Sequence, residues 1–467
     1  MVKGHRLLFV CPTSSPIGGV QTWLDQLSSG LEKRGWEPIV ALVHGPSTND
    51  STGYKVAHPN LETVTIDGST MTMGARVRAV MRTIKRLRPD YYIPMSVVDA
   101  HDAVCALKRN GDYHGRYVLS LHTNMPTQIA DATLFQPFAD VSVNPGALTC
   151  RLAEWAGMPK SHIFHVPNGT SLHPLHPQAA PQQPLRLAYV GRLADVDKRV
   201  TDMIGVVDAL ESMKLKYQLD VFGSGPCDEI LRNAITSRSV RFHGFVDSIS
   251  LHRDIFPQTD ILLSFSQSEG FGISLIEAMS HGVVPVSSKY VGHRTEGFLI
   301  DGETARLFDI GDTAGCAEVV RQLDRNRGTL ATLSQDAHKL VTSRYSWERC
   351  VDGWESALLS SRELEPRTVP AIPPREINEG NSLASRFRWL PAGLSDTFYK
   401  VKRRILGIPD AMKQGEEWPF DTRSFDVARL AAIEDLTVQL DEFIDSRKAS
   451  IAKPKASVKP GSNGLIA

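Results

Sequence analysis

Two glutamates in one short run are the side chains of this sequence best suited to chemistry. Glu269 and Glu277 are eight residues apart, after an apolar run, Ile261 to Phe265, that predicts a buried parallel strand. Gly270-Phe-Gly272 then predicts a turn into a helix, which Gly282 ends. The start of a helix offers unpaired backbone N–H groups to a phosphate, and a carboxylate just before it accepts hydrogen bonds from sugar hydroxyls. The run therefore predicts a site for a sugar joined to phosphate.

The run also resembles the nucleotide-sugar pocket of a known enzyme family, the retaining glycosyltransferases of family 4, which have the GT-B fold. In that family a Glu, seven residues and a second Glu mark the pocket, and here the pair is Glu269 and Glu277. The pair alone is a weak signal, because the alternative for Glu277 is a solvated residue of the first helical turn, stabilised by the helix dipole. The whole run is much more specific. The resemblance implies donor binding by Gly270, Phe271, Gly272, Ile273, Ser274 and Glu277.

Two cations are expected to complete this pocket. Departure of a nucleoside diphosphate builds negative charge, and one group preorganised toward such charge typically lowers the barrier by about 3–4 kcal/mol. Arg192 directly follows the predicted strand Leu185 to Val190, and Lys198 lies six residues further on. By resemblance, Arg192 and Lys198 clamp the diphosphate, and Glu269 orients the sugar hydroxyls and stabilises positive charge. The alternative is two solvated loop cations.

Two glycine pairs follow predicted strands. Gly18 and Gly19 stand between the strand predicted over Arg6 to Val10 and the helix predicted directly after Gly19. Their lack of side chains lets a phosphate approach the backbone there. Gly223 and Gly225 end another strand, but the third glycine of a nicotinamide-binding fingerprint is missing, which disfavours a dehydrogenase. The resemblance implies that all four residues line the donor site. A simple turn is the alternative for Gly18 and Gly19.

A histidine follows a predicted strand of the first half of the chain. His122 ends the strand predicted over Tyr117 to Leu121. An isolated histidine is more often structural. Its place matches a family position that contacts the donor sugar near the reacting carbon, so the resemblance implies a supporting catalytic role for His122.

One acidic motif could be taken for a metal site. Asp195-Val-Asp197 is similar to the metal-binding Asp-x-Asp of the other major glycosyltransferase fold. Arg192 and Lys198 flank it, however, and these cations already occupy the place where Mg²⁺ would act. We therefore expect no essential metal and no cofactor beyond the nucleotide-sugar substrate.

Two segments depart from the family pattern. Val291 to Glu296 contains one glycine where the family commonly has paired glycines before a Glu, and Gly302 to Ala305 ends on Ala where Gly is usual. The differences concern the sugar pocket. They leave Glu269, Arg192 and Lys198 unchanged.

Charge balance and cysteine use exclude several classes of protein. The 467 residues include 52 basic and 52 acidic side chains, so no overall charge favours nucleic acid. Six cysteines are scattered without a Cys-x-x-Cys pair, which is typical of reduced thiols rather than of a disulfide framework or a zinc site. The N-terminus does not resemble a signal peptide, and no stretch approaches twenty apolar residues. We expect a cytoplasmic protein.

Strands and helices alternate in two successive series, which predicts an α/β protein with two doubly wound parallel sheets facing across a cleft. The length suits two domains plus further material. Leu172 to Pro184 contains four prolines without periodicity, which is typical of a linker. The expected parts are an acceptor-side domain (1–171), the linker (172–184), a nucleotide-sugar domain (185–360) and a C-terminal extension (361–467).

The extension contains two features of its own. Residues 386–404 interleave six basic residues with four aromatics, which indicates either peripheral contact with the inner face of a membrane or a strap packed on the enzyme body. Further on, Asp426 predicts the start of a helix that would dock or self-associate. Its apolar residues are Leu430, Ile433, Leu436, Leu440 and Phe443.

These features together predict a retaining, metal-independent transferase. It would move a hexose-type sugar from a nucleoside diphosphate sugar to a hydroxyl acceptor, in polysaccharide or glycolipid assembly. The alternatives are a sugar nucleotide hydrolase or epimerase on the same fold and a non-catalytic scaffold that binds sugar nucleotides. The nucleotide, the sugar and the acceptor are left open.

Overall fold

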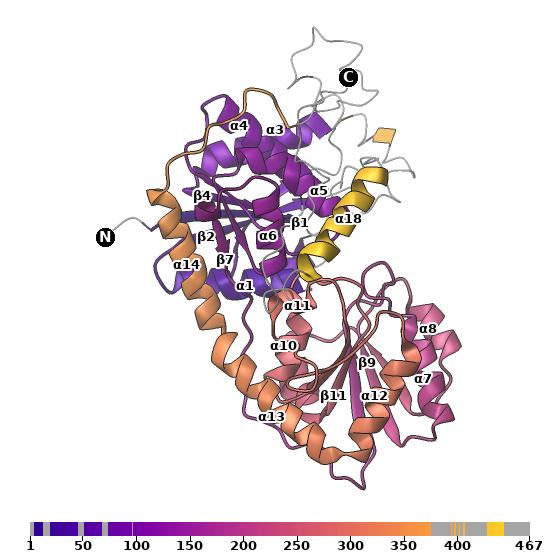
Figure 1. Ribbon diagram of the computed structural model, residues 1–467. Coiled ribbons are helices and arrows are strands. Elements are labelled where there is room, and N and C mark those ends of the chain that lie inside the picture. Colours follow the sequence, from indigo (N-terminus) through magenta and orange to yellow (C-terminus); the bar gives the residue numbers. More distant parts are fainter. Residues whose placement is uncertain are drawn as a thin grey trace.

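Two parallel sheets follow one another along the chain, and helices cover each of them (Figure 1). The computed structural model describes residues 4–12, 19–44, 51–67, 73–95, 97–374 and 427–442, together with Leu394, Thr397, Val401, Ile405 and Leu406. The two sheets confirm the predicted class, an α/β protein with two doubly wound, Rossmann-like domains.

The first sheet has seven strands in the order β3-β2-β1-β4-β5-β6-β7, and all pairings are parallel. The strands are β1 (Arg6–Pro12), β2 (Glu37–His44), β3 (Glu62–Asp67), β4 (Tyr91–Pro94), β5 (Arg116–Leu119), β6 (Val141–Asn144) and β7 (Ile163–His165). The helices are α1 (Gly19–Glu32), α2 (Thr52–Ala57), α3 (Met73–Leu87), α4 (Val98–Arg109), α5 (Pro126–Phe135) and α6 (Ala147–Trp155).

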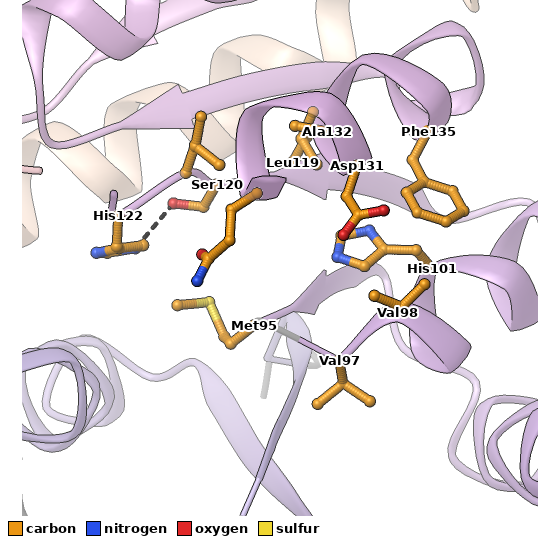
Figure 2. Close-up of a pocket in the computed structure, with 12 residues that line it drawn as sticks. Met95, Val97, Val98, His101, Leu119, Ser120, His122, Asp131, Ala132 and Phe135 are labelled. Carbon is orange, nitrogen blue, oxygen red and sulfur yellow. Dashed lines mark hydrogen bonds between the residues drawn. The ribbon is translucent and has the colours of Figure 1, made fainter. Parts of the chain in front are cut away.

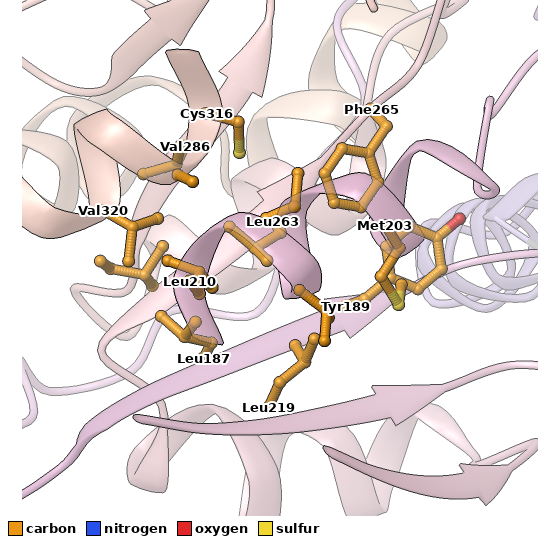
Figure 3. Packing of buried hydrophobic residues seen from close by; sticks show 14 of the residues in the cluster. Leu187, Tyr189, Met203, Leu210, Leu219, Leu263, Phe265, Val286, Cys316 and Val320 are labelled. Atoms are coloured by element: carbon orange, nitrogen blue, oxygen red, sulfur yellow. The ribbon is translucent and has the colours of Figure 1, made fainter. Parts of the chain in front are cut away.

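The second sheet has six parallel strands in the order β10-β9-β8-β11-β12-β13. They are β8 (Leu185–Val190), β9 (Tyr217–Phe222), β10 (Val240–Gly244), β11 (Ile261–Ser264), β12 (Val284–Ser288) and β13 (Arg306–Phe308). The helices are α7 (Asp202–Ser212), α8 (Asp228–Ala234), α9 (Ser248–Ser250), α10 (Ile273–Met279), α11 (His293–Glu296), α12 (Thr313–Arg325) and α13 (Arg327–Arg344). In its core, Leu187, Leu219 and Leu263 of three strands pack with Met203 and Leu210 of α7 (Figure 3).

The order of strands reverses at the centre of each sheet, between β1 and β4 and between β8 and β11. Loops that leave the carboxyl ends of two such strands diverge, and ligands of doubly wound sheets bind in the crevice between them. Arg192 and Lys198 lie in the loop after β8, and Glu269 lies in the loop after β11. The topology therefore brings the predicted cations and the predicted carboxylate to one crevice.

The last helix of the predicted second domain packs on the first domain instead. α14 (Trp347–Glu363) begins after Ser346, whose side chain accepts a hydrogen bond from the Arg349 backbone N–H. The buried face of α14 joins the core of the first domain, where Trp354 lies against Trp23 with ring centroids 5.3 Å apart. The sequence assigned residues up to 360 to the second domain, whereas α14 covers the first. Periodicity could not show this, because it identifies the apolar face of a helix but not the domain that this face covers.

The predicted helix of the extension is present and docks on its own chain. α18 (Val427–Glu442) lies against α5 and α6 of the first domain and α11 of the second (Figure 1). The predicted residues Leu430, Ile433, Leu436 and Leu440 pack around Leu148 and Leu152 of α6 and Ile129 of α5. Asp426, Phe443 and most of residues 386–404 lie outside the described residues, so membrane contact stays a prediction. Among the residues described, no helix has the length and apolar character needed to cross a bilayer.

Trp354→Ala is expected to lower the free energy of unfolding of the first domain by about 3–5 kcal/mol, because it empties a site that is 1% exposed between α14 and α1. Leu359→Ala on the same helix is the matched control, since Leu359 is 42% exposed. Urea unfolding followed by circular dichroism measures both variants. Equal stability of the two would contradict the packing of α14 described here.

Candidate functional site

Lys198 and Glu269 meet at the carboxyl edge of the second sheet. Lys198 Nζ lies 2.5 Å from Glu269 Oε1, and Ser266 Oγ donates to the same oxygen at 2.6 Å. The two loops follow adjacent strands of the switch point, so this contact is a consequence of the topology. The Lys198 and Glu269 side chains keep 22% and 13% of their surface exposed, which leaves the pair accessible to a ligand.

Arg192 is held by Asp197 rather than by Glu269. Its Nη2 donates to both carboxylate oxygens of Asp197 at 2.9 Å. The Asp197 carbonyl oxygen accepts a hydrogen bond of 2.9 Å from the Gln267 N–H, which ties the loop after β8 to the loop after β11. The Arg192 side chain is 59% exposed, so an anion can reach it without breaking a buried ion pair.

Both carboxylates of the Asp195-Val-Asp197 motif have partners within their own loop. Asp195 Oδ1 accepts hydrogen bonds from the Thr201 N–H at 3.1 Å and from the Thr201 hydroxyl at 2.7 Å. Asp197 pairs with Arg192. The two side chains therefore stabilise the loop that carries the cations.

Gly223 and Gly225 shape the same loop from the neighbouring strand. A Cβ at Gly223 would lie 1.8 Å from the Gly191 carbonyl oxygen, and one at Gly225 would lie 2.4 Å from the Leu193 carbonyl oxygen. Gly223 also has φ of +147°, which L side chains rarely adopt. The two glycines thus position Arg192 by close backbone contact, and their predicted contact with a donor stays a prediction.

The two domains touch through Gly270. A Cβ there would lie 2.0 Å from the His122 carbonyl oxygen, so only glycine lets the loops after β5 and β11 approach so closely. At the start of α1, a Cβ at Gly19 would lie 3.1 Å from Ile273 Cδ1 of α10. The structure therefore brings predicted residues of both domains into contact. Gly18 lies outside the described residues.

Asn124 ties Glu269 to the first domain, a role that no sequence motif indicates. Its Nδ2 donates to the Glu269 carbonyl oxygen and, at 3.3 Å, to the Val291 carbonyl oxygen. The Glu269 N–H donates to the same Val291 oxygen at 3.4 Å. The Glu269 backbone is thus fixed between domains while its carboxylate contacts Lys198. The one available signal was the place of Asn124, two residues after His122 in the same loop.

His122 borders a pocket at the carboxyl ends of β4 and β5 (Figure 2). Its Nε2 lies 3.0 Å from Ser120 Oγ, and its ring packs on Trp23 with centroids 4.4 Å apart. Burial lowers the pKa of His122 to about 3, so the ring is neutral at neutral pH. Other residues that line the pocket include Met95, Val98, His101, Leu119, Asp131 and Phe135.

The start of α10 has the predicted geometry only in part. Gly272 precedes the helix with φ of +86°, a left-handed conformation that favours glycine. Ile273 and Ser274 of the first turn are half-buried. Phe271 packs into the apolar core of the second domain, so only its backbone remains for a donor.

Among the described residues, no hydrogen bond or ion pair joins the Glu277 side chain to Lys198 or to Glu269. Its side chain is 10% exposed, and His252 Nε2 lies 3.8 Å from Glu277 Oε1. Its predicted role in donor binding therefore stays a prediction.

Asp441 of α18 caps α11 across the domain boundary. Its Oδ2 accepts a hydrogen bond of 2.8 Å from the Gly292 N–H, and its Oδ1 accepts bonds from the Thr295 N–H at 3.1 Å and hydroxyl at 2.7 Å. These residues belong to the segment that departs from the family pattern, and they directly follow Val291. The C-terminal extension therefore stabilises the backbone next to Glu269.

Glu296 makes a second bridge between the domains. Its Oε1 accepts a hydrogen bond of 2.7 Å from the Ala147 N–H at the start of α6. Burial raises the pKa of this carboxyl, although the hydrogen bonds and His165 oppose that rise. Glu296 of the second domain thus caps the start of α6 in the first domain.

Comparisons with known proteins show the family of both domains. The model of the family described as Glycosyltransferase Family 4 matches residues 17–173, and the model described as Glycosyl transferases group 1 matches residues 184–326. Together they span most of both domains. This chain belongs to the family 4 glycosyltransferases.

Relatives and solved structures extend the likeness. The sulfoquinovosyl transferase of Arabidopsis thaliana is 26% identical over 49% of this chain, which spans about half the length of that relative. The phosphatidyl-myo-inositol mannosyltransferase of Mycolicibacterium smegmatis is 24% identical over 73% of this chain and 90% of its own. The Anabaena protein HepE, solved with UDP and glucose, superposes with a TM-score of 0.61 at 16% identity, covering 76% of this chain and 99% of that one. This superposition supports the GT-B fold of the glycosyltransferase.

Gly270→Ala is expected to lower the rate of glycosyl transfer about 100-fold, because its methyl group would clash with the His122 carbonyl and displace the two loops by a substantial part of an ångström. Gly53→Ala in α2 is the control, since no atom lies within 4 Å of a Cβ at that position. Initial rates of product formation measure both. An unchanged rate for Gly270→Ala would show that this contact is not needed for transfer.

Asp441→Ala is expected to lower the free energy of unfolding by about 1–3 kcal/mol, because it leaves the buried Gly292 N–H and the half-buried Thr295 N–H without their acceptor. Glu442→Ala, at the exposed neighbouring residue, should change stability by less than about 0.5 kcal/mol. Thermal and urea unfolding of the full chain compare the two. If both variants match the parent chain, α18 does not brace the site.

Proposed function

We propose that this glycosyltransferase moves a hexose-type sugar from a nucleoside diphosphate sugar to a hydroxyl acceptor, with retention at the anomeric carbon. The observation that supports this most directly is the contact between Lys198 and Glu269 in the switch-point crevice of the second sheet. In the proposed reaction Lys198 would hold the diphosphate and Glu269, next to it, would hold the sugar. Family membership supports the same reaction class.

Lys198 and Arg192 would stabilise the diphosphate as it leaves. Negative charge grows on the phosphate oxygen when the anomeric bond breaks, and preorganised cations lower the free energy of that state. Each cation starts in contact with a carboxylate, Glu269 or Asp197, so the donor phosphates would compete for cations that are already held in place. Glu269 would then be released toward the sugar hydroxyls and the positive charge near the anomeric carbon.

The acceptor would enter from the first domain. The pocket beside His122 lies in this domain and combines apolar residues with the polar groups of His101 and Asp131 (Figure 2). The acceptor hydroxyl would attack on the face that the diphosphate leaves, and the leaving phosphate would take its proton. His122, which is neutral, would contribute a hydrogen bond and not a charge.

We further propose that the reaction needs no essential metal, because Lys198 and Arg192 provide the positive charge that Mg²⁺ would supply. The acceptor class that we favour is a saccharide or a lipid-linked saccharide, since one relative is a mannosyltransferase named for the lipid phosphatidyl-myo-inositol. Residues 386–404 would then hold the enzyme at the inner face of a membrane from the cytoplasm.

Lys198→Ala is expected to lower kcat/KM for the donor by about 10²–10³, which corresponds to the loss of one group aimed at the departing charge. Lys339→Ala, an exposed lysine on α13, is the control and should retain full activity. The measurement is release of nucleoside diphosphate at saturating acceptor. Unchanged donor turnover in Lys198→Ala would remove Lys198 from the proposed clamp.

The reaction itself is tested with UDP-, GDP- and ADP-sugars, with and without saccharide and lipid acceptors, in the presence of EDTA. A glycosylated product with retained anomeric configuration supports the proposal. Donor breakdown that ignores the acceptor would indicate a hydrolase or epimerase, and binding without turnover would indicate a scaffold. Loss of product in EDTA that Mg²⁺ restores would contradict metal independence.

A further inference from the structure

Three histidines from distant parts of the chain gather behind α10. His173 belongs to the linker, His252 follows α9, and His281 follows α10. One ring nitrogen of each lies within 4.8 Å of one ring nitrogen of each of the others. His281 is 1% exposed and the other two are half-buried, so the cluster is largely removed from water.

The nitrogens of this cluster are incompletely used by the protein. His252 Nδ1 and His281 Nε2 lie 2.9 Å apart, and one proton at most can lie between them. His173 Nε2 and His281 Nδ1 are buried and have no hydrogen-bond partner among the described residues. A buried imidazole nitrogen without a partner is energetically unfavourable, and a bound ligand removes that penalty.

The cluster also has the protonation state that a metal ion needs. Burial, and after it the charges of the neighbouring histidines, lower the pKa of His281 to about 2. Burial and His252 likewise lower the pKa of His173. Neutral imidazoles present lone pairs at neutral pH, and metal binding requires these unprotonated rings.

We propose that His173, His252 and His281 bind one divalent transition-metal ion, for which zinc is the best match. Imidazole nitrogen is a preferred ligand of Zn²⁺, with Zn–N bonds of about 2.0–2.1 Å and therefore roughly 3.4 Å between ligands of a tetrahedral ion. The His173 and His281 rings are stacked, with centroids 4.0 Å apart and planes at 17°, so the His173 ring must turn about its side-chain bonds until its lone pair points at the ion. A water molecule would fill the fourth position.

Glu277 supports this assignment from outside the cluster. His252 Nε2 faces Glu277 Oε1 at 3.8 Å, while its Nδ1 faces His281. Metal-bound histidines commonly direct their second ring nitrogen at a carboxylate, which fixes the ring and raises its basicity.

The ion would act as a structural brace rather than in sugar transfer. It would join the linker, through His173, to the C-terminal end of α10, through His281, and it would orient Glu277 from behind through His252. The site is separate from the Lys198–Glu269 pair, because it neither contains nor contacts either residue among the described contacts; it adjoins the predicted donor site only through Glu277.

Zinc binding is tested on the full-length chain after removal of metal with a chelator. Calorimetric titration with Zn²⁺ is expected to give one ion per chain, and Co²⁺ is expected to give the visible absorption of a tetrahedral site. His173→Gln should weaken Zn²⁺ binding at least about 100-fold, since it removes one of three ligands. Zn²⁺ should also raise the Tm of the parent chain but not that of His173→Gln.

His176→Gln is the matched control. His176 lies in the same linker and stacks on His281 at 5.2 Å, but it is outside the ligand set, so this variant should bind Zn²⁺ as the parent chain does. If His173→Gln fails to fold, His252→Gln, at a residue 12% exposed, replaces it. A parent chain that takes up neither Zn²⁺ nor Co²⁺ at micromolar concentration, or a His173→Gln variant that binds with parental affinity, would overturn the proposal. No donor sugar enters these measurements, so their outcome is separate from that of the transfer assay.

Discussion

The close contact between the Gly270 backbone and the His122 carbonyl is the constraint on which the site depends. It places the loop after β11 of one sheet directly on the loop after β5 of the other, at a distance that any Cβ would prevent. Asn124 and Glu269 can then share hydrogen bonds across the domain boundary. A carboxylate supplied by the second domain is thereby oriented by the first.

The charges of the crevice are paired before any donor is present. Lys198 contacts Glu269 and Arg192 contacts Asp197, and both pairs keep some exposure to water. Such pairs contribute little to stability, since solvent screens them and each side chain loses conformational freedom. Their value lies in fixing cations where an anion can replace a carboxylate with little reorganisation. A phosphate that arrives there meets charges whose positions are already set.

The chain crosses between its two domains more often than its single linker suggests. α14 returns to the first domain, α18 packs on the first domain and caps α11 of the second, and Glu296 of the second domain caps α6 of the first. The linker is itself attached to the second domain, where the Ala179 N–H donates to Asp260 at 2.8 Å. These connections restrict how the domains move relative to each other, and the proposed metal site would add one more at the base of α10.

The sequence by itself determined the class of fold, the strands that precede Arg192 and Glu269, the helix of the extension and the choice of Lys198 and Glu269 as candidates. These rest on local signals: apolar runs, turn glycines, helical periodicity and a motif of fixed spacing. It did not determine that α14 covers the first domain, that Asn124 holds Glu269, that Asp441 caps α11, or that three histidines converge behind Glu277. Only the tertiary structure decided these, because each depends on which residues from distant parts of the chain come within a few ångströms, and neither periodicity nor spacing along a chain records that distance.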